Sequence, residues 1–353
     1  MANWRLGFLS SIEWLPFVDR KFLFLIQLLA LLSIGRSAIE FSRRMMYMMV
    51  IFIVSIFLML INSMWTGHIS YFLTDFIILI FLVLFRNNIK VVSLMNGMLS
   101  ALVITAFYQI LTVTGVVNID LPHWIQEENG SWVNSSAIFK AQIGFNNKYN
   151  SLSVLYSLFI VIYVNIQNRL NIWVIVLIIG QVLTLGRAGL IITVIALLLR
   201  AKGLHRFSLT IGIAILFTYI ASNQDLTSLV LREGSNLSRL GQFNSVMNAS
   251  FSEIGILGRG FTYNQFASGA IHVHNFFLNS YVAMGPLGIL WSLIFFLFLI
   301  LRIRNLRVSY QLKIGLILFL VLQTLVENIN FLNMSISYIL FWSILFANKL
   351  SYR

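Results

Sequence analysis

Two histidines stand one residue apart in HVHN, residues 272–275, at the start of a long apolar segment. The chain has only 5 histidines among its 353 residues. A neutral imidazole accepts the proton of a hydroxyl group, so His274 is a candidate catalytic base, with His272 and Asn275 as substrate-binding candidates beside it. The alternative is that the histidines cap the helix or face solvent. Gly285, Pro286 and Gly288 interrupt the apolar segment that follows.

A metal site at the histidine pair is not expected. The chain has no cysteine, and no carboxylate near His272 and His274 completes a set of ligands. The lack of cysteine also excludes disulfides and a cysteine nucleophile. We therefore expect chemistry that needs neither a metal nor another cofactor.

Arg187 stands in LTLGRAGL, between two apolar runs with almost no polar residues around it. Its planar guanidinium suits two-point contact with phosphate, and the start of the following helix would add backbone N–H groups to the same anion site. Gly186 and Gly189 flank it and would let a ligand approach the backbone. The alternative is an arginine that extends to lipid headgroups from a helix end.

Other charged residues are weaker candidates. Arg239 lies in SRLGQF, and Arg259 lies in GILGRGF, a glycine-rich stretch that either cradles a phosphate or forms an ordinary turn. Glu327 ends an apolar run, and a carboxylate at that depth in a membrane is a candidate substrate-binding group unless it pairs with an arginine. Asp75 has the same status with less weight. The catalytic candidates are thus His274, Arg187 and Arg239, and the substrate-binding candidates are Arg259, Asn275, His272 and Glu327.

The elements that must position these residues are apolar. Hydrophobic residues make up 59% of the chain and charged residues 10%, and the mean hydropathy is +0.88. This composition predicts an all-α, polytopic integral membrane protein with about 11–12 transmembrane helices in a single domain, residues 1–353. The expected spans are 21–35, 45–62, 71–85, 92–114, 150–166, 170–186, 188–200, 207–222, 275–301, 312–328 and 331–348.

Every second connection between these runs carries most of the lysine and arginine, which predicts that those connections face the cytoplasm. Most of the net charge of +13 therefore reports topology, and nucleic acid is not an expected partner. The opposite face receives two long loops, 115–149 and 223–274, which hold most of the polar candidates. The first 20 residues form a twelfth span, lie along the membrane surface, or enter the membrane and return to the same side.

Four segments occur in order along the chain: LTLGRAGL, SRLGQF, GILGRGF and HNFFLNSYVAMGPLG. Their order and spacing resemble the O-antigen polymerase and O-antigen ligase superfamily of bacterial inner-membrane glycosyltransferases. The part that carries the motifs covers roughly residues 180–290. The chain departs from the usual pattern at Gly186, where the superfamily often has serine, and at His272, which is not a usual motif position.

The resemblance implies a GT-C-like architecture, an active periplasmic face in the bacterial inner membrane, and a metal-independent reaction without a cofactor. It implies that Arg187 and Arg239 contact a lipid-linked pyrophosphate and that His274 contacts the acceptor hydroxyl. The implied donor is an undecaprenyl-pyrophosphate-linked oligosaccharide, with membrane lipid around it and a chain-length regulator and a flippase as protein partners.

Three functions stay open from the sequence. The short chain and small cytoplasmic connections favour a polymerase of O-antigen, or a related surface polysaccharide, from lipid-linked repeat units. The first alternative is an O-antigen ligase that transfers the finished glycan to lipid A core. The second, from a different class, is a flippase or transporter of lipid-linked oligosaccharides, which would place charges along a path through the membrane.

Overall fold

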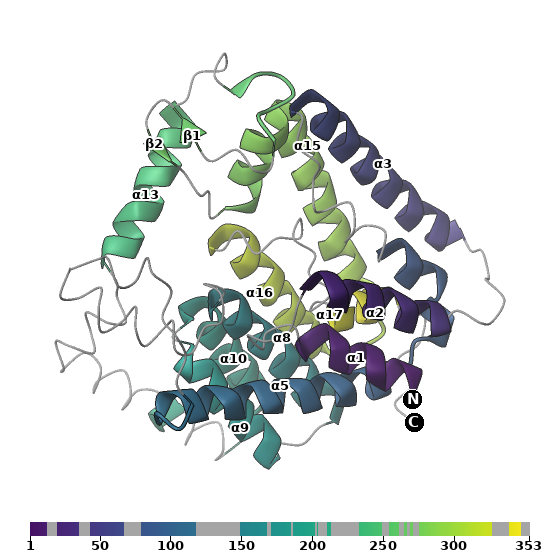
Figure 1. The fold of residues 1–353 in the computed structure, drawn as a ribbon, viewed down its shortest axis with the longest axis vertical. Helices are drawn as coiled ribbons and strands as arrows, with labels where there is room; N and C mark the ends of the chain where they lie inside the picture. Colours follow the sequence, from purple (N-terminus) through teal and green to yellow (C-terminus); the bar gives the residue numbers. More distant parts are fainter. Residues whose placement is uncertain are drawn as a thin grey trace.

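The computed structural model describes the chain in separate segments. They are residues 1–12, 20–34, 43–66, 79–117, 149–167, 171–184, 186–201, 203, 210–212, 233–248, 254–260, 265–266, 269–270, 275–326 and 339–346. Within them the fold is all-helical, apart from a two-residue antiparallel pairing of β1 (Gln265–Phe266) with β2 (Gly269–Ala270). Figure 1 shows the arrangement.

The helices occupy most of the predicted apolar runs. They are α1 (Ala2–Ile12), α2 (Arg20–Ile34), α3 (Arg43–Thr66), α5 (Val91–Val113), α8 (Tyr149–Gln167), α9 (Ile172–Leu183), α10 (Arg187–Arg200), α13 (Glu233–Asn248), α15 (Phe276–Arg304), α16 (Tyr310–Val326) and α17 (Ile339–Phe346), with a short 3₁₀ turn at Arg86–Asn88. The all-α fold class is therefore confirmed for the described residues. The expected span 207–222 is described only at 210–212, and the loop 115–149 lies almost wholly outside the described residues.

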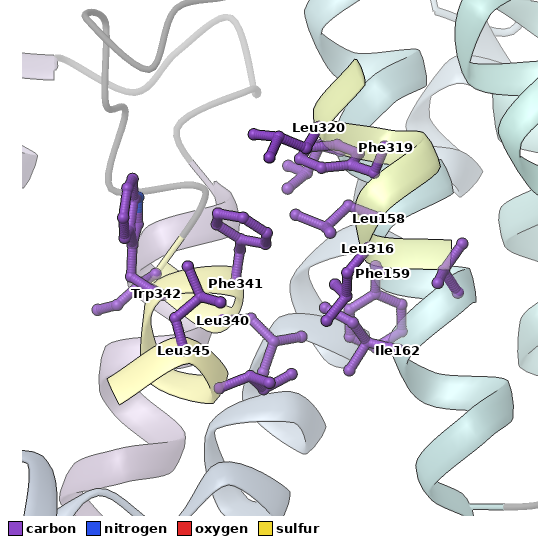
Figure 2. Close-up of a cluster of buried hydrophobic side chains, with 14 of the residues drawn as sticks. Leu158, Phe159, Ile162, Leu316, Phe319, Leu320, Leu340, Phe341, Trp342 and Leu345 are labelled. Atoms are coloured by element: carbon purple, nitrogen blue, oxygen red, sulfur yellow. The ribbon is translucent and has the colours of Figure 1, made fainter. Parts of the chain in front are cut away.

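Helix α8 is the centre of the packing. Its residues 152–164 are all buried, among them Tyr156 and Phe159, and it packs against α5, α9, α10 and α16. Figure 2 shows the contact with α16, where Leu158, Phe159 and Ile162 meet Leu316, Phe319 and Leu320 beside the aromatic residues of α17. Apolar side chains at three- and four-residue spacing on both helices produce this contact.

Helix α1 packs along α5 through two glycines. A Cβ atom on Gly7 would overlap the backbone of Leu94, and one on Gly97 would overlap the backbone of Trp4. Small residues let helix backbones approach this closely. At 11 residues α1 is about 17 Å long, too short to cross a membrane alone.

Helix α15 is bent into a V, so the interruption expected at Gly285 and Pro286 within the span 275–301 is present, as a reversal of direction. Gly285 has φ 63° and ψ −155°, which interrupts the helix, and Pro286 follows it. Residues 276–284, here called the short arm, fold back along residues 286–304, the long arm. The ring centroids of Phe277 and Phe296 lie 5.6 Å apart, whereas a straight helix would separate these positions by about 28 Å. The two arms are visible in Figure 1.

Helix α3 runs beside the long arm. The indole Nε1 of Trp291 donates a hydrogen bond of 2.9 Å to the hydroxyl of Ser55, which is fully buried. By length and composition α5 and α15 are long enough to cross a membrane. In α15 that length is divided between the arms, and the long arm alone is about 28 Å, close to the hydrocarbon thickness of about 30 Å.

Candidate functional site

The bend of α15 leaves backbone groups that another segment satisfies. In a regular helix the carbonyl of Val282 would accept from residue 286, but proline has no N–H. Instead the N–H of Arg259 donates to the Val282 carbonyl at 2.8 Å, and the N–H of Gly260 donates to the Ala283 carbonyl at 3.0 Å. The glycine-rich segment 254–260 is thereby fastened to the end of the short arm.

Asn62 of α3 closes the same junction. It is 4% exposed, and its side-chain amide donates to the carbonyl of Ala283 at 2.6 Å and to the carbonyl of Leu257 at 3.0 Å. One side chain thus joins α3, segment 254–260 and the bend of α15. We call this set of contacts the Asn62 clasp. It fixes the backbone of Arg259, whose side chain is exposed.

Two glycines are required where the clasp forms. Gly258 and Gly285 have φ values of 72° and 63°, in the region that side chains other than glycine rarely adopt. A Cβ atom on Gly258 would overlap the backbone at Ala283, and one on Gly285 would overlap the carbonyl of Ile256. The glycine-rich stretch around Arg259, which the sequence analysis interpreted as a phosphate cradle or an ordinary turn, serves here to pack against the bend.

The N-terminus of the short arm meets the end of α16. Asn275 caps the short arm, since its side-chain oxygen accepts from the N–H groups of Phe277 and Leu278 at 3.0 and 3.1 Å. Its side-chain nitrogen donates to the carbonyl of Leu325 at 3.4 Å. The side-chain amide of Asn275, a candidate substrate-binding group, is thus engaged in capping, a role that the sequence did not indicate for it.

Several predicted site residues lie outside the described residues. These are His272, His274, Glu327 and Asp75. His274 directly precedes Asn275 in the chain, and Glu327 follows Leu325 by two residues. The hydrogen bond between Asn275 and Leu325 therefore joins two chain positions that lie next to His274 and two residues before Glu327 in the sequence.

Helix α13 carries Arg239 and packs on the short arm. Val246 of α13, Val282 of the short arm and Ile254 form a small buried apolar cluster. Arg239 lies in the same helix, seven residues or two helical turns before Val246. Three of the predicted segments, those with Arg239, Arg259 and Asn275, are thus brought to one element, the short arm.

Arg187 is the first residue of α10, and its turn is held by α8. The hydroxyl of Ser153 donates to the carbonyl of Gly186 at 2.9 Å. The N–H of Gly186 donates to the hydroxyl of Thr184 at 3.3 Å. Both side chains are buried, so the backbone that carries Arg187 is fixed from two directions.

The expected role of the flanking glycines is wrong. Cβ atoms on Gly186 and Gly189 would both overlap Ser153, so these glycines give α8 a close approach to α10 and leave no room there for a ligand. Arg187 itself is half-buried. Ile191, one turn further along the same face, is 49% exposed. The accessible face of α10 at Arg187 is therefore the one that carries Ile191, away from α8.

A buried polar network behind this turn was missed in the sequence. The amide of Gln181 donates to the carbonyl of Ser153 at 3.1 Å and accepts from the hydroxyl of Thr193 at 2.8 Å. Close by, the hydroxyl of Tyr156 donates to the side-chain oxygen of Gln109 at 2.8 Å. Polar residues spaced among apolar ones in these helices are the signal that would have indicated the network.

The end of α16 lies at the same level as the Arg187 turn. Gly315 packs on Val161, and Figure 2 shows the two helices running in opposite directions, with Leu320 and Leu158 further along. Eight residues beyond Gly315 stands Gln323, and eight residues before Val161 stands Ser153. Eight residues correspond to about 12 Å along a helix axis, and α8 and α16 are antiparallel. Gln323 and Ser153 therefore lie at about the same height along the two helices.

Among the described residues, no group of three or more histidine, aspartate or glutamate side chains is arranged to hold a metal ion. Compared with known protein families and with curated protein sequences, the chain shows no match.

Proposed function

We propose that this chain is a polytopic membrane protein of the bacterial inner membrane that polymerises undecaprenyl-pyrophosphate-linked repeat units at the periplasmic face. The product is O-antigen or a related surface polysaccharide. The proposal rests on the resemblance of the ordered motifs, on the exposed apolar surface and on the contacts of the short arm.

Exposed apolar side chains support the membrane part of the proposal. Helix α3 exposes large hydrophobic residues over most of its length, and α9 and the long arm of α15 do the same; on α3 they are Met46, Tyr47, Val50, Ile53, Val54, Phe57, Leu60 and Met64. Water-soluble monomers rarely expose continuous apolar surface on this scale. A hydrocarbon environment would cover it.

One observation carries the catalytic part of the proposal. The short arm of α15 begins directly after His274, is clasped by the Arg259 segment, packs against α13 with Arg239, and meets the end of α16. Arginine guanidinium groups suit a pyrophosphate leaving group, and an imidazole suits a hydroxyl acceptor. A single short helix thus links the segments that bear both kinds of group.

The mechanism we infer is direct displacement at the anomeric carbon of the donor. The acceptor hydroxyl oxygen forms the new glycosidic bond while the bond from that carbon to the pyrophosphate oxygen breaks. His274 takes the hydroxyl proton. Arg187 and Arg239 stabilise the charge that develops on the departing lipid pyrophosphate.

A second candidate function is transport of a lipid-linked oligosaccharide. The short arm is a half-helix, and half-helices with their N-termini at the substrate are common in transporters. The ligase alternative differs from a polymerase in its acceptor and is separated from it by the products in cells.

The test uses a smooth lipopolysaccharide strain that lacks this gene and is complemented with wild type, Arg187→Ala, His274→Ala or Arg200→Ala. Arg200 is the matched control, because it ends the same helix that Arg187 begins. The readouts are the lipopolysaccharide ladder on a gel and the amount of protein in the membrane.

For a polymerase, deletion leaves core with a single repeat unit. The Arg187 and His274 variants do the same at normal abundance, and Arg200→Ala restores the ladder. Bare core with accumulated lipid-linked polymer identifies a ligase. Bare core without any periplasmic lipid-linked repeat unit identifies a transporter, and an unchanged ladder on deletion rejects all three.

A further inference from the structure

Gln323 is the exception among the buried glutamines of the described chain. It is 1% exposed, and neither its side-chain nitrogen nor its side-chain oxygen has a hydrogen-bond partner among the described residues. Gln181 and Gln109, both fully buried, have partners at 2.8 to 3.1 Å. A buried amide without hydrogen-bond partners lowers the stability of the fold, so a functional role of Gln323 has to be considered.

The position of Gln323 indicates that reason. It lies in the last turn of α16, two residues before Leu325, whose carbonyl accepts from the Asn275 cap of the short arm. It also shares a level with Ser153, which holds the Arg187 turn. Gln323 therefore lies close to the start of the short arm, at the same height along the helix bundle as the turn that carries Arg187.

We propose that Gln323 is a substrate-binding residue for the saccharide next to the donor pyrophosphate, an inference that rests on the proposed function. A carboxamide offers both a donor and an acceptor, which matches the hydroxyl and acetamido groups of a sugar. The saccharide reaches it when the short arm parts from α16, at the end where the Asn275–Leu325 hydrogen bond of 3.4 Å is near the geometric limit.

A purely structural role predicts a different response to mutation. Replacing an unpartnered buried amide by an apolar side chain of similar size is neutral or stabilising for the fold. If Gln323 only fills space, Gln323→Leu keeps both stability and function. If it binds substrate, the same variant keeps stability and loses function.

The experiment compares Gln323→Leu, Gln323→Met and Thr324→Val in the deletion strain described above, with Arg187→Ala in parallel. Thr324 is the matched control, since it is also 1% exposed but its hydroxyl is bonded within its own helix. Purified proteins in detergent are unfolded thermally, and the ladder is quantified at equal membrane abundance.

We expect both Gln323 variants to unfold at or above the wild-type temperature and to lower the yield of long polymer about tenfold, as loss of two neutral hydrogen bonds implies. Thr324→Val keeps the ladder. A normal ladder with both Gln323 variants, or loss of the folded protein with both, overturns the inference. If the Arg187 variant abolishes the ladder in that case, the proposed function survives; if deletion leaves the ladder intact, the proposed function fails as well.

Discussion

Two close contacts hold the segments that carry Arg187 and Arg259. In each of them, adding or removing one small group should change the stability of the protein. At Gly189 the neighbouring helix is so near that no Cβ atom fits beside Ser153. At Asn62 one amide nitrogen serves two carbonyls from different parts of the chain. Each site therefore predicts a specific response to a small substitution.

Gly189→Ala is expected to destabilise the protein by about 1–3 kcal/mol, because the added methyl group meets the backbone of α8. Gly241→Ala is the matched control, since Gly241 is also inside a helix but has open space around it. It should be neutral or stabilising by up to about 1 kcal/mol through helix propensity. Thermal unfolding in detergent measures both, and equal effects would contradict the close packing of α8 and α10.

Asn62→Leu is expected to lower the free energy of unfolding by about 1–3 kcal/mol, because the Leu257 carbonyl loses its side-chain donor in a buried site. Asn244→Leu, at an exposed position of α13, should change it little. Chemical or thermal unfolding of the two purified variants tests the Asn62 clasp. A neutral Asn62 variant would show that the clasp does not stabilise the bend.

The residues in these contacts are recognisable in the sequence only in part. Arg187 and Arg259 stand out because they lie outside the connections that carry most of the lysine and arginine. Asn62 does not, because its partners lie 195 and 221 positions further along the chain. Ser153 reaches the Arg187 turn from 33 positions away. Patterns of neighbouring residues do not indicate contacts between positions this far apart. Asn62 and Ser153 are therefore recognised as supporting residues only in the folded structure.

At the scale of elements, the V of α15 can be tested by labelling single introduced cysteines. Because the chain has no cysteine, each variant carries only the introduced thiol. Leu287→Cys lies just after the bend and is 44% exposed, and Leu278→Cys lies near the start of the short arm. Arg302 and Arg304 end the long arm and should face the cytoplasm, which puts the bend on the opposite side of the membrane. A membrane-impermeant maleimide should therefore label position 287 and spare 278. A straight helix predicts the reverse order.

Labelling of intact cells and of detergent-solubilised protein gives the two measurements needed. Solubilised protein should react at position 287 at least as fast as in cells, which shows that the thiol is chemically competent. Preferential labelling of position 278 in cells would reject the V.

Most helices follow from the sequence because their apolar runs are long. The V does not, although the sequence shows Gly285 and Pro286. A Gly-Pro pair in an apolar run fits either a modest kink or a full reversal. The choice is made by segment 254–260 and Asn62, which supply partners for the carbonyls at the bend.

At the scale of the whole molecule, the distribution of lysine and arginine predicts which end of each helix faces the cytoplasm, and this orientation can be tested on α5. Helix α5 spans 23 residues, about 34 Å, between Arg86 and Lys90 at one end and Val116 at the other. The basic end should face the cytoplasm. A green fluorescent protein fused after Asn88 should fluoresce, and alkaline phosphatase fused after Val117 should be active. The opposite pair of signals would invert the proposed topology.

The bend of α15 also has a consequence for biogenesis. Residues 276–304 leave the ribosome as one apolar stretch, and the partners that hold the V come from both sides of it: Asn62 and segment 254–260 are already synthesised, but α16 is not. Insertion machinery that senses local hydrophobicity would first accept a straight helix. The short arm then has to turn back as Asn62 and segment 254–260 bind the carbonyls at the bend, so variants that weaken the Asn62 clasp should lengthen maturation and expose the nascent protein to membrane proteases.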